Sequence, residues 1–230
     1  MYLALDALNT VDTPASLQVI VFFTDGAPNT FASRFRMNDM DKKNYKGSIS
    51  SGDGFSGTPY GLWKYKQLHE KHGNANVGWD IDDHLAYLPD YYTAHNADAT
   101  KYKIVNPDHP RRQVTQYYPN SHSAKDLYKR VNRVARNLVE DISETAREDD
   151  IYVFTLGLGA SLTSNTGPDS EKGEDLLLRM ANDPSMIAYK NLADDYNPDQ
   201  LQGVYCHAVD QEALGPCFDE MLDVIIRLTM

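Results

Sequence analysis

The segment that most constrains the fold is an uninterrupted apolar run that stops at a carboxylate. It reads Gln18-Val-Ile-Val-Phe-Phe-Thr-Asp-Gly-Ala-Pro-Asn29. A run that is apolar on both faces is typical of a central strand in a parallel sheet, with helices above and below. Ligands of such sheets bind just outside the carboxyl ends of the strands, so the run predicts a functional position at Asp25. Gly26 and Pro28 also suit a plain strand-ending turn.

The charge of the chain limits its partners. The 230 residues carry a formal net charge of −11, with a pI of about 5.0. This charge argues against nucleic acids and anionic membranes and favours cations or basic surfaces. No stretch has the roughly 18 apolar residues of a membrane span, and the N-terminus lacks the layout of a signal peptide. We expect no nucleic-acid partner and no membrane span in this chain.

Two cysteines, Cys206 and Cys217, bear on the cellular compartment. Their spacing matches no CxxC or Cys/His metal motif. A disulfide between them and a pair of free buried thiols fit the sequence equally well. If the disulfide forms, the protein belongs to an oxidising compartment, such as the cell envelope or the exterior.

Hydrophobic periodicity predicts helices and strands in the first and last parts of the chain. The clearest helix follows Ser123, a candidate N-cap, because apolar residues recur from Leu127 to Ile142 at spacings of three and four. Its basic residues precede its acidic ones, which opposes the helix dipole, so tertiary packing must stabilise it. The other predicted elements are helices at 2–9, 173–181 and 218–228, a buried strand at 151–159, and short strands near 187–189 and 204–207.

Residues 31–122 differ from the rest of the chain in amino-acid composition. They hold nine of the fifteen tyrosines, both tryptophans and six of the seven histidines, among many turn-forming residues. Apolar periodicity is scarce apart from a short candidate helix near Leu62–His72. We interpret this region as a loop-rich insertion with small elements, suited either to protein or glycan contact or to plain packing.

The apolar segments together resemble the von Willebrand factor A domain. The matching segments are Val19–Asn29, Asp150–Gly159, Leu176–Asp183 and Phe218–Thr229. Leu-Arg-Met-Ala-Asn-Asp-Pro (178–184) and Ile-Ile-Arg-Leu-Thr (225–229) look most like the variant in bacterial TadG-like Flp pilus-assembly proteins. The resemblance implies an α/β fold with a doubly wound, mostly parallel, Rossmann-like sheet. It covers only the second half of that fold.

The resemblance also implies a metal-ion-dependent adhesion site at the strand ends. Its ion is usually Mg²⁺, with Mn²⁺ or Ca²⁺ as alternatives, and its ligands come from three loops. Asp25 matches the aspartate that opens the Asp-Gly turn, but no Asp-x-Ser-x-Ser occurs, and Ser48–Asp53 has those residue types in the wrong order. Since Mg²⁺ needs six oxygens near octahedral geometry, Asp25 alone is a partial ligand. We expect this chain alone not to bind the ion.

The missing motif leads us to expect a fold that is incomplete at its N-terminus. Residues 1–30 and 123–230 would form the α/β core, and residues 31–122 the insertion. Strand 18–24 would then lack a neighbour and expose an apolar edge. The alternative is a complete protein in which the insertion or a partner chain fills the gap.

Other candidate sites have weaker patterns. His69 and His72 lie one helical turn apart but do not form His-Glu-x-x-His, and the cluster from Asp80 to His84 lacks the spacing of a calcium loop. Gly157-Leu-Gly159 lacks the remaining residues of a phosphate-binding loop, and Cys206-His207 is only an adjacent pair.

The function that these patterns favour is binding and not catalysis. The resemblance implies an adhesion-type module of a bacterial cell-envelope or pilus-assembly protein, extracytoplasmic and anchored through upstream sequence. Its partner would be a protein that presents a carboxylate, or other envelope components. The alternative is a metal-dependent, phosphatase-like hydrolase that uses Asp25 and histidines of the insertion; Ala27 stands where a related nucleophile motif has a second aspartate.

Overall fold

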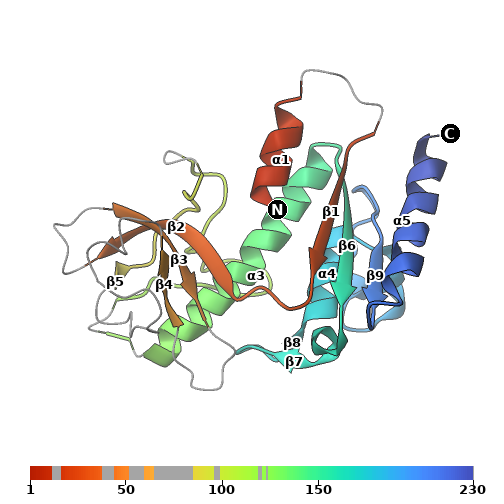
Figure 1. Ribbon diagram of the computed structural model, residues 1–230. Helices are drawn as coiled ribbons and strands as arrows, with labels where there is room; N and C mark the ends of the chain where they lie inside the picture. The colour runs from red at the N-terminus through yellow and green to blue at the C-terminus, as the bar shows by residue number, and fades with distance from the viewer. Residues whose placement is uncertain are drawn as a thin grey trace. The chain divides into compact units, whose positions relative to one another are not determined.

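The chain has a mixed α/β fold, given by a computed structural model (Figure 1). It forms two compact units: the first contains Met1–Ala27, Val139–Thr166 and Ser170–Met230, and the second contains Pro28–Leu138 and Gly167–Asp169. Within the described residues, no helix has the length and apolar character needed to span a membrane. The described residues are 1–11, 17–37, 44–51, 60–64, 85–95, 99–118, 121–122 and 124–229.

The first unit is built on a parallel sheet of three strands, as expected for an α/β fold. The strands are β1 (Val19–Thr24), β6 (Tyr152–Leu158) and β9 (Tyr205–Ala208), in the order β1-β6-β9. β6 pairs with β1 from Val19↔Tyr152 to Thr24↔Gly157, and with β9 from Thr155↔Tyr205 to Leu158↔Ala208. All three carboxyl ends therefore lie at one edge of this sheet.

Helices cover both faces of this sheet. On one face, α5 (Leu214–Thr229) buries Cys217 and Met221 against Phe154 and Leu156 of β6. On the other face, α4 (Gly173–Ala181) packs near Phe22 of β1 and Tyr205 of β9. Successive residues of a strand point to opposite faces, so a strand covered on both sides is apolar throughout. This explains the continuous apolar run of β6.

The prediction of a buried, central strand is wrong for β1, whereas the exposed apolar edge expected of strand 18–24 is present among the described residues. Among the described residues it is an edge strand, paired only with β6. Val21 is 47 % exposed and Phe23 52 % exposed, whereas the facing strand β6 is almost entirely buried. The apolar composition of β1 matches a central strand, but its position is that of an edge with apolar side chains in contact with solvent.

The predicted long helix is present as α3 (Ala124–Glu148), and its apolar stripe from Leu127 to Ile142 is buried. Ser123, its expected N-cap, lies outside the described residues. Tertiary partners account for its unfavourable charge order. Arg133 donates to Asp169 at 2.6 Å within the second unit, and Arg147 donates to the carbonyl oxygen of Met180 within the first.

The remaining elements of the first unit are short. Helix α1 (Tyr2–Asn9) is present where predicted, and α4 ends at Asn182, which adopts the left-handed conformation that often terminates helices. The strand expected at 187–189 is wrong: Pro184–Ala188 forms the 3-10 helix η2, because Asp183 caps it and Pro184 begins it. The others are η1 (Ala160–Thr163), β7 (Asn165–Thr166), β8 (Glu171–Lys172) and η3 (Ala193–Asp195).

The second unit contains an antiparallel sheet, where we expected loops with small elements. Its strands are β2 (Thr30–Met37), β3 (Asn44–Ser50), β4 (Tyr60–Lys64) and β5 (Leu85–Tyr87), in the order β4-β3-β2-β5. The candidate helix at Leu62–His72 is wrong over the three of its residues that the structure describes, because Leu62–Lys64 belong to β4. The sequence signal was the alternation Phe31-x-Ser33-x-Phe35, whose three side chains are buried on one face of β2.

The predicted boundaries 1–30, 31–122 and 123–230 stay a prediction. The compact units change at Pro28 and within α3, which contributes residues up to Leu138 to the second unit and from Val139 to the first. The second unit therefore includes the N-terminal part of α3, which the predicted insertion did not include.

Cys206 and Cys217 are joined by a disulfide, with 5.5 Å between their Cα atoms. The bond connects β9 to α5, and Cys217 lies in the apolar cluster between that helix and the sheet. Of the two alternatives left open by the sequence, the structure has the covalent one. Because Cys206 lies between Tyr205 and His207, the bond restrains the strand that carries both side chains.

We expect the double substitution Cys206→Ala with Cys217→Ala to lower the free energy of unfolding by about 2–3 kcal/mol, because the disulfide restricts the unfolded chain. Guanidinium unfolding without reductant measures this difference. As a control, adding reductant should lower the midpoint of the wild type and leave that of the double variant unchanged. A wild-type midpoint that does not respond to full reduction would contradict the prediction.

Candidate functional site

Asp25 lies at the carboxyl end of β1 and is exposed, as the sequence predicts. Ser161, in the loop after β6, donates from its hydroxyl to the carbonyl oxygen of Asp25 at 2.7 Å. Thr24 stabilises the same turn, since its hydroxyl donates to the carbonyl oxygen of Gly26 at 2.9 Å. These contacts join the ends of two adjacent strands and hold the Asp25 turn at the edge of the sheet.

At the carboxyl end of β6, hydrogen bonds join β9 to the loop that follows β6. His207 of β9 donates from Nε2 to the carbonyl oxygen of Gly159 at 2.9 Å, and the amide of Gly159 donates to Ala208 at 2.8 Å. Gly159 has φ of +86°, which favours glycine. A Cβ at Gly157 would lie 2.5 Å from Leu162, so this glycine allows close packing of the loop. Gly157 and Gly159 therefore lie where β6 ends and the following loop begins.

The described residues around Asp25 supply few groups for a divalent ion. Within the described part of the chain, no group of three or more His, Cys, Asp or Glu residues could hold a metal ion. Asp25 brings one carboxylate, and the hydroxyl of Ser161 is bonded to the Asp25 backbone. Mg²⁺ requires six oxygen ligands, several of them usually water, and one protein carboxylate is a weak anchor for it.

The structure describes only some of the other predicted candidates. His69, His72 and the cluster Asp80, Asp82, Asp83 and His84 lie outside the described residues. Of the segment Ser48–Asp53, the first three residues belong to β3 and the second unit, and the residues from 52 onward are not described. Cys206 is in the disulfide and therefore is no nucleophile, while its neighbour His207 has the hydrogen bond to Gly159.

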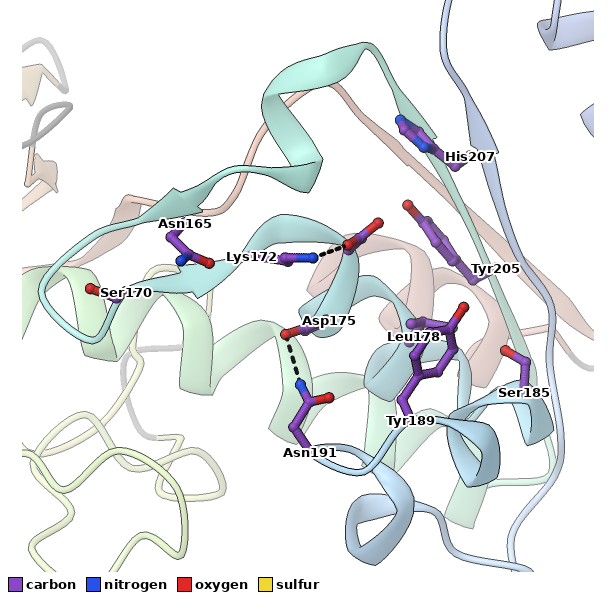
Figure 2. A pocket seen from close by; sticks show the side chains of 11 residues that line it. Asn165, Ser170, Lys172, Asp175, Leu178, Ser185, Tyr189, Asn191, Tyr205 and His207 are labelled. Atoms are coloured by element: carbon purple, nitrogen blue, oxygen red, sulfur yellow. Dashed lines mark hydrogen bonds and ion pairs between the residues drawn. The ribbon is translucent and has the colours of Figure 1, made fainter.

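A cavity of about 480 Å³ lies in the first unit and was not predicted. Figure 2 shows side chains from four segments around it: the β7–β8 hairpin, α4, the η2 segment and β9. The residues that line it are Asn165, Ser170, Lys172, Glu174, Asp175, Leu178, Ser185, Tyr189, Asn191, Tyr205 and His207. The lining residues form no sequence motif, so the sequence did not indicate the cavity.

The cavity is polar, and its charged side chains are acidic in excess. Lys172 donates to Glu174 at 2.9 Å, and this hydrogen bond raises the pKa of the lysine. Asn191 donates to Asp175 at 3.2 Å, and burial raises the pKa of that carboxyl group despite the nearby Arg179 and Lys172. Lys172, Glu174 and Asp175 together give one net negative charge.

Tyr205 is unusual because its buried hydroxyl has no hydrogen-bond partner within the described part of the chain. Burial is the main cause that raises the pKa of this phenol, and the negative charge of Glu174 adds to it. An unsatisfied buried hydroxyl costs about 1–3 kcal/mol. Such a group in the wall of a polar cavity indicates a place for a further hydrogen-bonding atom.

The end of α4 positions Tyr205 and η2. Asp183 accepts from the amide of Tyr205 at Oδ2 (2.7 Å) and from the amide of Ser185 at Oδ1 (2.8 Å). Asn182 donates to the carbonyl oxygen of Asn197 at 2.7 Å. Both side chains are buried, so this pair orders the turn-rich segment that follows.

A buried ion cluster fixes α4 itself. The guanidinium of Arg179, 7 % exposed, pairs with Glu140 of α3 at 2.7 Å, with Glu171 of β8, and with Asp195 of η3 at 3.6 Å. A buried cation with several acceptors is much better satisfied than one with a single partner. The cluster therefore connects four elements around one side chain.

Comparison of the chain with family models, with curated proteins and with solved structures finds no match. No family is therefore assigned through similarity to a known protein. The function proposed below is supported by the arrangement of the strand ends and by the sequence resemblance described above.

We expect Arg179→Met to lower the free energy of unfolding by about 3–5 kcal/mol, because it leaves buried carboxylates without their cation. Urea unfolding followed by circular dichroism measures the change. Arg133→Met is the control: it breaks a more exposed pair with Asp169 and should cost about 1 kcal/mol or less. Equal losses for the two variants would contradict the importance of the buried cluster.

Asp175→Asn should change how stability depends on pH. A carboxyl group whose pKa is raised by folding binds more protons in the native state, so its contribution to stability falls as pH rises through the window between its unfolded and folded pKa values. The wild type should therefore lose stability relative to the variant as pH rises from below 3.8 towards neutral. Denaturation midpoints of both proteins at several pH values test the sign. A gap that moves in the opposite direction would refute a raised pKa.

Proposed function

We propose that the first unit is a von Willebrand factor A-like module that binds another protein at the carboxyl edge of its sheet. The observation that carries the proposal is the exposed Asp25 turn, which opens directly after a parallel strand and is held by Ser161 from the next strand's loop. Exposed polar loops at this edge are the usual ligand position of open α/β sheets.

The strand order supports the finer fold within this proposal. The three parallel strands follow one another across the sheet in chain order, as they do in one half of a doubly wound sheet. Helices cover both faces, and β1 is at the edge where the other half of such a sheet would continue. The segments Leu178–Pro184 and Ile225–Thr229, which carry the TadG-like resemblance, lie in α4 and its cap and in α5.

The partner we propose is a protein of the bacterial cell envelope or of a pilus-assembly system. The disulfide of Cys206 and Cys217 supports an oxidising, extracytoplasmic location. A partner that presents a carboxylate depends on a complete ion site, and the described residues around Asp25 do not make one. We therefore propose that the loops at the strand ends contact the partner directly.

The binding proposal is tested with a photo-crosslinking residue at position 27, next to the Asp25 turn. We expect envelope extracts of the source organism to give a discrete adduct from position 27 and none from an exposed control position, 194 on η3. Adding Asp25→Asn should weaken the adduct from position 27, because the substitution removes the charge of the turn. The same adducts from both positions, or none from either, would argue against a binding site at this edge.

The hydrolase alternative has no supporting observation in the described residues. A phosphatase assay on the wild-type protein tests it. We expect no turnover of p-nitrophenyl phosphate with Mg²⁺ or Mn²⁺, because no group of three or more His, Cys, Asp or Glu side chains in the described part of the chain could hold the catalytic metal. Turnover that disappears in Asp25→Asn would replace the binding proposal with a catalytic one. Turnover that persists in that variant would come from a different site or from a contaminant.

A further inference from the structure

We infer that one face of the antiparallel sheet in the second unit binds an acidic peptide segment in extended conformation. This cationic face carries Arg34 and Arg36 of β2 and Lys46 of β3. All three residues belong to the second unit, so the inference does not depend on the function proposed above for the first.

Strand pairing brings the three cations together. Arg34 and Arg36 alternate with Phe35, which is completely buried, so both arginines lie on the opposite face of β2. The antiparallel register places Lys46 directly across from Arg34. In such a pair of strands, residues two apart lie about 7 Å from each other, and directly opposite residues have Cβ atoms about 5 Å apart. The three side chains therefore start from neighbouring points on one side of the sheet.

The charge on this face is not neutralised at the two arginines. Arg34 is exposed and Arg36 is half-buried, and neither guanidinium has a hydrogen bond or an ion pair within the described residues. In contrast, Arg133 of the same unit is paired with Asp169. Like charges directly opposite each other on two strands destabilise a sheet, and Arg34 and Lys46 are such a pair. A local arrangement that costs stability is expected where function requires it, and a bound anion would remove the cost.

The distribution of charge between the two units supports an acidic ligand for the second. The sequence of the first unit has 5 Lys and Arg against 21 Asp and Glu, whereas that of the second has 17 against 12. The second unit therefore has a formal charge of +5, and the excess of negative charge in the chain comes entirely from the first unit. Such a difference in charge directs anionic ligands to the second unit.

The type of donor and its spacing favour the carboxylates of an extended peptide. A guanidinium is planar and binds a carboxylate through two parallel hydrogen bonds. Successive side chains of an extended peptide point to opposite sides, so acidic residues at alternate positions lie on one side, about 7 Å apart. This spacing matches that of Arg34 and Arg36. The net charge of −11 disfavours a long polyanion such as a nucleic acid, whereas a short segment with few carboxylates is repelled much less.

Three blocked peptides of equal length serve as probes of the cationic face. The first has two glutamates at alternate positions among serines, the second has the two glutamates at adjacent positions, and the third has glutamines in place of the glutamates of the first. We would titrate the full chain with each peptide at low salt and follow the amide resonances of β2 and β3 by NMR. We expect saturable shifts with the alternating peptide, with a dissociation constant on the order of millimolar. The adjacent peptide should bind about threefold more weakly, because only one of its carboxylates faces the arginines, and the glutamine peptide should give no shifts.

Substitutions test whether the two arginines make the contact. Arg34→Gln and Arg36→Gln should each weaken binding of the alternating peptide about threefold, as expected for the loss of one exposed ion pair. Arg34→Gln should also leave the unfolding midpoint unchanged or raise it, because it removes the repulsion with Lys46; a residue that only stabilised the sheet would lower it. Lys129→Gln is the matched control: it removes the same charge from an exposed position on α3 of the same unit and should leave peptide binding unchanged.

Four results would overturn the inference. Absence of shifts in β2 and β3 with the alternating peptide would exclude the site. Equal affinity for the alternating and adjacent peptides, or equal losses in Arg34→Gln and Lys129→Gln, would show nonspecific attraction to a positively charged unit. Tighter binding of a thymidine oligonucleotide than of the alternating peptide would make the face a nucleic-acid site instead. Self-association of the chain that disappears in Arg34→Gln would show that the occupant is the acidic unit of a second copy.

Discussion

The first unit depends most on the buried guanidinium of Arg179. One positive charge on α4 pairs with carboxylates from α3, β8 and η3, and the removal of the guanidinium leaves these carboxylates without it in a poorly hydrated interior. The ion pairs of Arg179 therefore fix the positions of these elements relative to one another. Asp175 lies one helical turn before Arg179 on α4, so the cluster also fixes the acidic wall of the cavity.

The strand-end edge and the cavity share one support, although they differ in chemistry. His207 lines the cavity and bonds to Gly159 at the strand-end edge, and the disulfide at Cys206 restrains the strand between them. Gly157 lets Leu162 and Tyr205 approach the sheet closely. The strand ends present an exposed turn, whereas the cavity is lined by polar side chains with one acidic charge in excess.

Much of the first unit could be predicted, because its helices and strands have strong local patterns. The stripe of α3, the cap of α4 and the apolar run of β6 each follow from spacing or from a single residue type. The failures have physical causes. Ile187 and Tyr189 favour strand by composition, but the Asp183 cap and Pro184 direct the chain into η2. In the second unit, the short alternation of β2 was hidden among turn-forming residues, and pairing with β3 and β5 stabilises it.

By itself, the sequence determined that Asp25 ends a strand, that α3 has one apolar face and that the chain is strongly acidic, because these properties depend on neighbours along the chain. The tertiary structure decided that β1 is an edge strand among the described residues, that Cys206 and Cys217 are bonded, and that Tyr205 lines the same cavity as Glu174 and Asp175. Each of these outcomes depends on which distant segments meet, and the free energy of burying side chains and pairing charges between those segments is not encoded in any local spacing.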